Sequence, residues 1–364
     1  MSLIVHVDSE TGFSGGEVQV FLLMESLAKS GFENVLVCPA GSRAFEEAAA
    51  RSIPTFEVRL RNDLDLMSVL RLASWLRKSG ADLVHLHTGR ATWLGGLAAK
   101  LAGIPAITTR RMDRDVSRGF RTRLIYGSLV RRAIAISDGV RGCLLAGGVP
   151  DEMIRVISSV VDPSKLEPQG EPVNVRRELG IGEDEFLLLT MAALVPRKAL
   201  DVLIDAVAAL DNRAVKFRTL IAGDGPERAA LEEQVERLGI QAQVSFLGFR
   251  SDKVDLLGAA DAFVLPSHRE GLGVAALEAM AAGKAVVASR VGGLAEVVDD
   301  GRTGFLVEAG DADLLAEAIG RVATDAPLCA ELGRRGRERL LSHFSVEAQA
   351  EQYIETYAQV LAGS

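Results

Sequence analysis

Two glutamates, Glu270 and Glu278, are separated by seven residues in a stretch that predicts a strand, a loop and a helix. The apolar run 262–265 predicts a buried strand, and the Ala- and Leu-rich residues from Leu272 onward favour a helix that ends near Gly283. Eight residues advance roughly 800° around a helix, about 80° beyond two full turns, so both carboxylates face one broad side. Carboxylates accept hydrogen bonds from sugar hydroxyls, and two of them could hold two diols, such as those of a hexose and a ribose. The alternative is that Glu270 caps the helix and Glu278 is a solvated helix residue.

Two adjacent basic residues, Arg197 and Lys198, stand between a predicted strand at 186–191 and a predicted helix at 200–210. The dipole of a helix disfavours cations at its N-terminus. Their position therefore favours a functional role over the alternative of two solvated bases.

A glycine-rich loop, Gly12 to Gly16, follows the first predicted strand, 3–7, and precedes a helix predicted from Glu17. This order lets the backbone approach an anion closely at the N-terminus of a helix. The glycines do not form G-x-G-x-x-G, so the loop does not predict a dinucleotide site. The alternative is a purely structural turn.

Strands and helices alternate along the chain, which predicts an α/β fold with mostly parallel sheets covered on both faces. The segment Asp162 to Pro172 is rich in Pro, Gly and polar residues and is predicted to link two domains. Two Rossmann-like domains facing across a ligand-binding cleft are the natural architecture. We place them at 1–165 and 166–343, followed by a helix at 344–364.

The length of 364 residues suits two domains, and 48% hydrophobic and 25% charged residues are typical of a soluble globular protein. The three cysteines lie far apart, which argues against a disulfide framework or zinc site and fits a reducing cytoplasm. The first residues lack the pattern of a signal peptide, and no apolar run approaches the roughly 20 residues of a membrane-spanning helix. We therefore expect a cytoplasmic protein. A net charge of −8 argues against a nucleic-acid partner.

The pattern Asp-x-Asp, which can hold a divalent cation on a diphosphate, occurs at 63/65, 113/115 and 311/313. Matches of this kind are expected by chance, and the pair at 311/313 is typical of a helix start. His85 and His87 face the same side of a strand end, but no further ligands follow with the spacing of a metal site. We interpret His85 as a packing residue and His87 as a packing or pocket-rim residue, and we predict no metal and no cofactor.

Eight arginines and two acids fall between Arg110 and Arg132. From Arg118 onward the pattern could form an amphipathic helix with arginines on its polar side. One interpretation is a surface for a phosphorylated acceptor or for anionic lipid, which allows peripheral contact with the inner face of the plasma membrane. The alternative is a solvated face. The residues assigned to this surface are Arg110, Arg111, Arg114 and Arg118.

Several short motifs follow one another in a characteristic order. They are Gly15-Gly16-Glu17, Pro196-Arg197-Lys198, Ala222-Gly223-Asp224-Gly225-Pro226-Glu227, Phe246-Leu247-Gly248, the Glu270 to Glu278 segment, Val291-Gly292-Gly293 and Thr303-Gly304-Phe305. Over nearly the whole chain this order resembles glycosyltransferase family 4, the retaining nucleotide-sugar enzymes also called glycosyl transferases group 1. The resemblance implies the GT-B fold, in which two Rossmann-like domains face each other and a C-terminal helix crosses back to the first.

The resemblance also implies roles for single residues in a metal-independent transfer from a nucleoside-diphosphate sugar. Glu270 would bind donor-sugar hydroxyls, while Arg197 and Lys198 would stabilise the charge on the departing diphosphate. Glu278 would bind the ribose. Further donor-binding positions implied by the resemblance are Gly15, Gly16, Gly223, Gly248, Gly271, Leu272 and Gly273.

The sequence departs from the family pattern at three places. Ala193 stands where the family has an arginine that binds phosphate, and Ala199 replaces the glycine after the lysine. The first-domain histidine that normally touches the donor sugar is absent, and Arg110 and Arg111 occupy its place.

These features predict a hexosyltransferase that serves cell-envelope polysaccharide or lipopolysaccharide synthesis. It would move a hexose-type sugar from a nucleotide-sugar donor to a glycan or lipid-linked acceptor, with retention of configuration and without metal. Two alternatives stay open. One is a non-catalytic nucleotide-sugar-binding protein, such as a partner subunit. The other is a related phosphorylase or a hydrolytic nucleotide-sugar enzyme with the same cleft.

Overall fold

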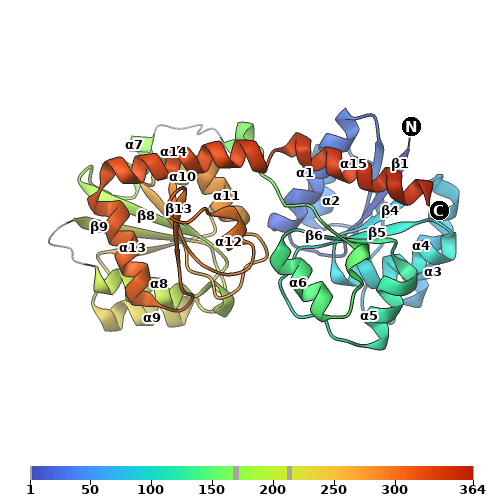
Figure 1. Cartoon of the computed structure of the whole chain (residues 1–364), viewed down its shortest axis with the longest axis horizontal. Helices are drawn as coiled ribbons and strands as arrows, with labels where there is room; N and C mark the ends of the chain where they lie inside the picture. The colour runs from blue at the N-terminus through green and yellow to red at the C-terminus, as the bar shows by residue number, and fades with distance from the viewer. Residues whose placement is uncertain (1, 167–171, 211–214, 364) are drawn as a thin grey trace. The chain divides into compact units, whose positions relative to one another are not determined.

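The computed structural model describes residues 2–166, 172–210 and 215–363. The chain divides into two compact units, one formed by Met1–Val160 with Val346–Ser364 and the other by Val161–Ser345 (Figure 1). The sequence analysis placed the corresponding boundaries at 165 and 343. Residues 167–171, in the predicted link, lie outside the described residues.

The first unit contains a sheet in which all neighbouring strands are parallel. The chain runs outward from β1 to β3, then returns to the other side of β1 with β4, so the strand order reverses between β1 and β4. His6 of β1 lies opposite His85 of β4 in this register. Open α/β sheets bind ligands beyond the carboxyl ends of the strands at such a reversal. In spatial order the strands are β3 (Thr55–Glu57), β2 (Glu33–Cys38), β1 (Leu3–Val7), β4 (Leu83–Leu86), β5 (Ala106–Arg110), β6 (Arg132–Ala135) and β7 (Ile154–Val156).

Helices join these strands and cover the sheet. The last helix of the chain, α15 (Val346–Ala362), belongs to this first unit and packs beside α1 (Gly15–Lys29), as Figure 1 shows. Its Tyr353 and Tyr357 are buried in one apolar cluster with Leu27 of α1, Ile4 of β1 and other residues of the sheet. This return of the C-terminal helix agrees with the architecture implied by the family resemblance. The remaining helices are α2 (Arg43–Ala50), α3 (Leu66–Ser79), η1 (Ala91–Gly95), α4 (Gly96–Ala102), α5 (Phe120–Leu124), η2 (Ile125–Leu129), α6 (Asp138–Ala146) and η3 (Asp151–Met153).

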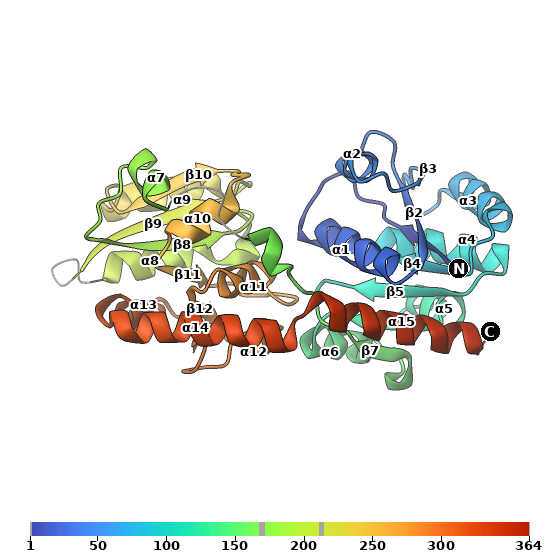
Figure 2. The same ribbon diagram turned by 90° about the horizontal axis from the view of Figure 1, so that it is seen from above.

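The second unit contains another sheet of parallel strands, and its order reverses between β8 and β11. The strands are β10 (Val244–Gly248), β9 (Lys216–Ala222), β8 (Glu185–Met191), β11 (Ala262–Leu265), β12 (Ala285–Ser289) and β13 (Gly304–Val307). Figure 2 shows the strands from β10 to β12 following one another in this order.

Apolar residues of these strands form one core with four of the helices, α8 (Leu200–Ala209), α9 (Arg228–Leu238), α13 (Ala312–Thr324) and α14 (Ala326–His343). The strand residues Leu188, Val264 and Val287 of this core come from three adjacent strands and are fully buried. The other helices of the unit are η4 (Pro163–Leu166), α7 (Pro172–Glu178), η5 (Pro196–Lys198), α10 (Lys253–Ala259), α11 (Val274–Ala281) and α12 (Leu294–Val297).

One predicted helix differs from the structure. The helix expected from Arg118 begins at Phe120, and it consists of the five residues of α5 followed by the wider π-type turn η2. Local composition indicated helical structure there, but it did not indicate the change of helix type. A similar wider turn, η1, precedes α4.

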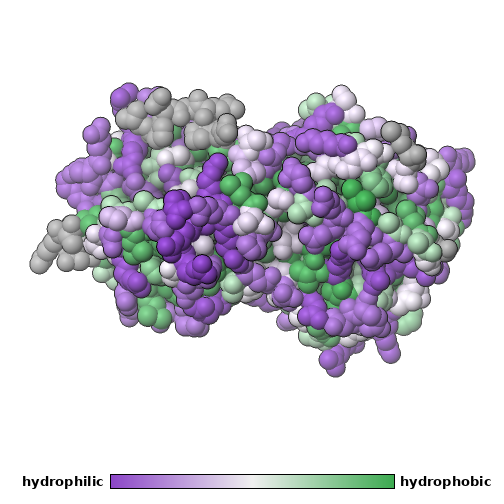
Figure 3. Space-filling view, turned by 45° about the horizontal axis from the view of Figure 1, so that its top comes forward, coloured by the Kyte–Doolittle hydropathy of each residue, from purple (hydrophilic) through white to green (hydrophobic). Residues whose placement is uncertain are grey.

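The face shown in Figure 3 is mainly hydrophilic, with smaller hydrophobic patches between the hydrophilic areas. Among residues 2–166, 172–210 and 215–363, none of the helices combines the length and the apolar content that crossing a bilayer requires.

Candidate active site

Lys198 and Glu270 form an ion pair at the reversal point of the second sheet. Lys198 follows β8 and Glu270 follows β11, the two strands between which the order reverses. The ammonium of Lys198 donates to Oε2 of Glu270, and these side chains are only 11% and 13% exposed. A cation and a carboxylate with little access to water are thus held together where an α/β sheet binds ligands.

Further contacts fix the two loops to each other. Ser267 Oγ donates to the same Glu270 oxygen at 3.4 Å, and the backbone N–H of His268 donates to the carbonyl of Arg197 at 2.9 Å. Arg197 Nη1 lies 4.0 Å from Glu270 Oε2, but its side chain is 52% exposed. Arg197 is therefore able to reach a bound anion, while Lys198 stays fixed beside the carboxylate. The structure brings the three predicted residues together.

A glycine turn fixes the backbone of Glu270, and Glu270 is not the residue that caps α11. Gly273, with φ +93°, is the residue before α11. Gly292 has φ +43°, and a Cβ there would lie 2.1 Å from the Glu270 carbonyl, to which Gly293 donates at 3.2 Å. Only glycine allows this close approach. Leu272, assigned to the donor site by resemblance, is buried, so its side chain packs in the interior.

Two other glycines with predicted donor roles support the loop after β8. A Cβ on Gly223 would lie 1.9 Å from the carbonyl oxygen of Ala192, and Gly223 N–H donates to Gly248 O at 2.8 Å. Both glycines have positive φ, +142° and +67°. Their shared function in this structure is close backbone packing beneath the segment that carries Ala193 and Lys198.

Glu278 also forms a pair with a lysine. It lies on α11, its side chain is 13% exposed, and Lys253 at the first turn of α10 donates to Oε1. Lys253 was not among the predicted site residues. The helix dipole disfavours a cation at the start of a helix. The argument that singled out Lys198 could therefore have singled out Lys253 as well.

In the first unit, the glycine loop begins α1 with an occupied cap. Ser14 Oγ accepts from Gly16 N–H at 3.3 Å, and Glu17 Oε2 accepts from the backbone and hydroxyl of Ser14. This reciprocal arrangement is a capping box, and its Ser-x-x-Glu pattern could have been read from the sequence. A Cβ on Gly15 would meet no atom within 4 Å, so nothing in the described packing requires glycine there.

Three histidines lie under the carboxyl ends of β1 and β4. His6, His85 and His87 are buried, and a ligating atom from each lies within 4.8 Å of the others. Burial lowers the pKa of His6 to about 4 and the pKa values of His85 and His87 well below normal, so all three are neutral. The predicted common side for His85 and His87 is confirmed by ring centroids 4.0 Å apart.

Hydrogen bonds assign the protons of two of these rings. Asn34 donates through Nδ2 to two backbone carbonyls, so its Oδ1 must accept from His6 Nε2 at 3.0 Å. His6 Nδ1 then accepts from His87 Nε2 at 2.9 Å, which leaves His87 Nδ1 to accept from Arg111 at 3.3 Å. Donation therefore runs from Arg111 through His87 and His6 to Asn34.

The third histidine is engaged at both nitrogens as well. His85 Nδ1 lies 2.8 Å from Tyr357 Oη, and Nε2 lies 2.7 Å from Thr109 Oγ1. All six ring nitrogens of the histidine cluster thus have protein partners. A metal ion bound by the three rings would displace several of these hydrogen bonds, so the donor set fits a polar core better than a metal centre.

The four arginines assigned to an acceptor or membrane surface face different partners. Arg111 reaches inward to His87, and its Cδ lies 3.8 Å from the place a Cβ on Gly16 would take. Arg110 donates to the carbonyl of Arg114, and Arg118 donates to the carbonyl of Ala146 at 2.8 Å. Three of the four guanidinium groups are therefore used to hold local structure.

Asp8 follows β1 and completes the polar groups near the glycine loop. It is buried, and burial raises the pKa of its carboxyl to about 7. Its Oδ1 accepts from the backbone N–H of Glu10 at 2.8 Å. Sequence reasoning missed it, because one aspartate after a strand carries no pattern.

Comparison with known proteins decides the family. The model described as "Glycosyltransferase Family 4" matches residues 13–165, and the model described as "Glycosyl transferases group 1" matches residues 174–339. The lipopolysaccharide core biosynthesis glycosyltransferase LpsE of Rhizobium meliloti (strain 1021) is 36% identical over 350 residues, covering 95% of this chain and 97% of that protein. The chain belongs to glycosyltransferase family 4.

This family 4 glycosyltransferase is also 33% identical to the D-inositol 3-phosphate glycosyltransferase of Saccharomonospora viridis over 321 residues, which cover 81% of this chain and 74% of that protein. The structure of Anabaena HepE in complex with UDP and glucose superposes with a TM-score of 0.88 at 23% identity, covering 99% of this chain and 100% of that one. The predicted family, GT-B fold and transferase activity are confirmed. The roles of individual site residues stay predictions.

Proposed function

We propose that this glycosyltransferase transfers a hexose-type sugar from a nucleoside-diphosphate donor, with retention of configuration and without a metal ion or other cofactor. The observation that carries the proposal is the Lys198–Glu270 pair, with Arg197 beside it, at the reversal point of the second sheet. The site thus offers adjacent groups for the two halves of an activated sugar, a carboxylate for hydroxyls and cations for the diphosphate.

The charge change during transfer explains the basic residues. When the bond between the anomeric carbon and the diphosphate oxygen breaks, negative charge grows on the leaving group, and fixed cations stabilise that charge. Lys198 is held in place by Glu270, so little reorganisation accompanies the reaction. Arg197 provides a second, more exposed cation and compensates for the alanine at position 193. These side chains perform the task that a divalent cation performs in metal-dependent transferases.

Retention follows from the face of the sugar on which the acceptor attacks. Glu270 is occupied by Lys198, so it is poorly suited to attack the anomeric carbon as a nucleophile. In the proposed step the acceptor hydroxyl oxygen bonds to the anomeric carbon while its proton passes to the departing phosphate oxygen. Entry on the side from which the diphosphate leaves preserves the configuration. Glu278 is proposed to accept hydrogen bonds from the ribose hydroxyls. These hydrogen bonds would replace its ion pair with Lys253.

The proposed acceptor is a glycan or lipid-linked glycan of cell-envelope polysaccharide or lipopolysaccharide. Its support is the similarity to LpsE, named for lipopolysaccharide core biosynthesis, over 95% of the chain. The proposal places the enzyme in the cytoplasm, and at the inner face of the plasma membrane when the acceptor is carried on a lipid.

A thermal-shift screen tests the donor site. At equal concentration, a ligand that binds the folded protein more tightly stabilises it more, so one class among UDP-, GDP- and ADP-sugars should raise Tm most. Lys198→Met and Glu270→Gln should each reduce that shift, whereas Glu308→Gln, on a side chain 73% exposed, should not. Product from the preferred donor should keep the anomeric configuration by NMR, and EDTA should not reduce the rate. A donor shift that survives both site substitutions would refute the assignment.

A further inference from the structure

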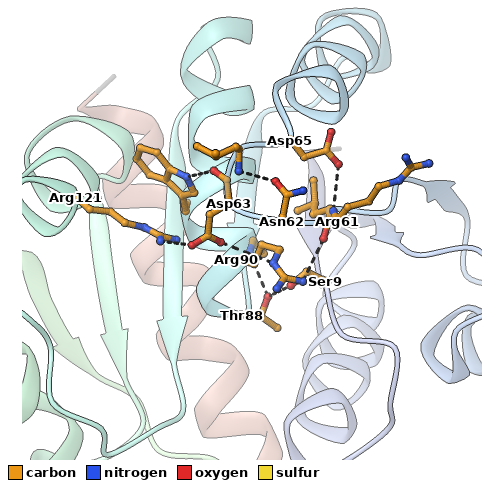
Figure 4. Close-up of polar contacts among 12 residues, drawn as sticks. Ser9, Arg61, Asn62, Asp63, Asp65, Thr88, Arg90 and Arg121 are labelled. Atoms are coloured by element: carbon orange, nitrogen blue, oxygen red, sulfur yellow. Dashed lines mark hydrogen bonds and ion pairs between the residues drawn. The ribbon is translucent and has the colours of Figure 1, made fainter.

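Arginines of this chain serve two different purposes. Beside a pocket of about 830 Å³ in the first unit, Arg90 and Arg121 both contact the carboxylate of Asp63, as Figure 4 shows. Acids and bases compensate one another there, so the pocket favours no particular charge on a ligand. On α14 of the second unit, Arg337 and Arg339 donate instead to backbone carbonyls at the ends of two other helices.

Arg337 completes the end of α11, the helix that carries Glu278. An α-helix leaves its last four carbonyls without partners inside the helix. Three of these carbonyls of α11 accept from the backbone N–H groups of residues 282–284, each within 3.1 Å. The fourth, that of Ala281, accepts from Arg337 Nη1. Because Glu278 lies three residues before Ala281, this bond fixes the helical turn from which Glu278 projects.

Arg339 binds the end of α12, the short helix that follows the glycine turn behind Glu270. Its Nε donates to Val297 O at 3.0 Å, and its Nη2 donates to Glu296 O at 2.8 Å. α12 directly follows Gly293, whose N–H donates to the carbonyl of Glu270 at 3.2 Å. The guanidinium of Arg339 therefore anchors the segment that holds the backbone of Glu270.

Glycines bring α14 close enough for these contacts. A Cβ on Gly333 would lie 2.0 Å from the carbonyl oxygen of Gly283, just after α11, and a Cβ on Gly336 would lie 3.4 Å from a side chain of α11. Both α14 glycines are buried and, three positions apart, share one face of the helix. Arg337 and Arg339 are separated by about 200° around the helix, so they leave α14 on either side of this face.

The positive charge of the two arginines strengthens the contacts. The C-terminus of a helix carries partial negative charge, which favours a cation there, and a hydrogen bond from a charged donor is about twice as strong as a neutral one. Other arginines of α14 are used differently, since Arg334 and Arg335 pair with Glu331 and Glu338 on the same helix. Arg334 and Arg335 therefore provide matched comparisons on one helix.

We propose that Arg337 and Arg339 are positioning residues of the donor site, Arg337 for Glu278 and Arg339 for Glu270. The inference rests on the proposed transferase roles of these two carboxylates. Loss of Arg337 would release the end of α11 and displace Glu278, which binds a part of the donor that the reaction leaves unchanged. Loss of Arg339 would loosen the glycine turn and displace Glu270, which holds the sugar during transfer. The two arginines therefore act on different kinetic constants.

Steady-state kinetics of Arg337→Met and Arg339→Met test the assignment. The measured rate is release of nucleoside diphosphate from whichever UDP-, GDP- or ADP-sugar raises Tm most. We expect Arg337→Met to raise the donor KM at least threefold and to change kcat less than twofold. Arg339→Met should lower kcat at least tenfold and change the donor KM less than twofold. Circular dichroism melting selects a temperature at which every variant is folded, so loss of folded protein does not enter the rates.

Lysine variants distinguish positioning from a general loss of packing. Arg337 uses one donor, so Arg337→Lys should restore most of the donor affinity. Arg339 uses two donors toward two carbonyls, which the single ammonium of lysine matches less well, so Arg339→Lys should stay impaired. Arg334→Met and Arg335→Met are the controls and should keep both constants.

Turnover of Arg339→Met equal to that of Arg335→Met would overturn the proposal, and so would an equal fall of kcat in Arg337→Met and Arg339→Met. Failure of the proposed function gives a different result. Normal turnover in Glu270→Gln would remove the role of the carboxylate itself, whereas an impaired Glu270→Gln beside a normal Arg339→Met would remove only the positioning role.

Discussion

Lys198 and Glu270 are 72 positions apart in the chain, yet they share one ion pair, because β8 and β11 are neighbours in the parallel sheet. Each residue belongs to the loop that follows its strand, so the sheet order places both side chains at one edge. Glu270 is fixed by Lys198, Ser267 and the glycine turn at Gly292, which defines one orientation for its carboxylate.

Replacing this carboxylate should impair turnover more than folding. Glu270→Gln keeps the shape but loses the charge that holds Lys198 and attracts sugar hydroxyls, so we expect kcat/KM to fall by roughly 100-fold or more. Steady-state rates with the preferred donor measure the effect, and circular dichroism melting reports the fold. Glu308→Gln is the control on an exposed glutamate of the same unit. Normal turnover in Glu270→Gln would rule out its catalytic role.

Glu278 should act mainly on donor affinity. It is proposed to bind the ribose, a part of the donor that does not change during the reaction, so Glu278→Gln should raise KM by about tenfold, the worth of one charge-assisted hydrogen bond. Because uniform binding affects KM rather than kcat, kcat should change much less than in Glu270→Gln. Initial rates over a range of donor concentrations separate the two constants. A fall in kcat equal to that of Glu270→Gln would contradict the ribose role.

The sequence was sufficient for the fold and for singling out Glu270 and Lys198, which the structure brings together, because both depend on local patterns. Apolar runs ended by glycine, proline or charged loops mark the parallel strands. The loops that carry Glu270 and Lys198 directly follow such strands, so the position of these two residues at strand ends could be predicted. The Ser14–Glu17 capping box was equally local and could have been found.

Pairings between distant residues could not be read in this way. His6 lies opposite His85 only because β1 and β4 pair in a particular register. The alternation of side chains within a single strand does not predict that register. The partners of Glu278 and His85, Lys253 and Tyr357, likewise come from separate elements. The run of arginines from Arg110 to Arg118 likewise gave no sign of its partners, and three of these guanidinium groups bond to other parts of the protein.

The histidine cluster should make stability depend on pH. The histidine pKa values lie below those of the unfolded chain, so the unfolded state binds more protons and stability is lost as pH falls from about 6.5 toward 4. Asp8 acts in the opposite direction, because its pKa is raised to about 7 and its contribution is lost as pH rises toward that value. Three histidines outweigh one aspartate, so Tm should rise between pH 5 and 6.5.

Two substitutions separate these contributions. His6→Gln removes one of the three histidines that make Tm rise with pH, so it should flatten that rise. Asp8→Asn removes the carboxyl that counteracts the rise, so it should make the rise steeper. Calorimetric melting across the pH range gives both slopes, which are informative even if the variants differ in overall stability. Identical slopes in the parent protein and both variants would show that these groups do not titrate on unfolding.

The two tyrosines of α15 should contribute unequally to the stability of the first unit. Tyr357→Phe removes the partner of His85 Nδ1 and leaves that buried nitrogen without a hydrogen bond, which should cost about 1–3 kcal/mol. Tyr353→Phe should cost less, because Thr109 keeps its hydrogen bond to His85. Urea unfolding followed by near-ultraviolet circular dichroism compares the two. Equal losses would show that the hydroxyl–imidazole bond is not decisive.

Gly292 provides a test of how strictly the Glu270 backbone must be held. Gly292→Ala would put a Cβ 2.1 Å from the carbonyl of Glu270, so the loop must move and the carboxylate with it. A displacement of about 1 Å at a reacting group can lower the rate roughly 100-fold. We therefore expect kcat/KM to fall to that extent in Gly292→Ala.

Gly301→Ala is the matched control, since Gly301 also has positive φ, +71°, but its Cβ would meet no atom within 4 Å. Gly301→Ala should lose about 1 kcal/mol of stability through backbone strain and keep its turnover. Equal turnover in the two variants would mean that the position of Glu270 tolerates displacement, and the ion pair with Lys198 would then not be the element that organises catalysis.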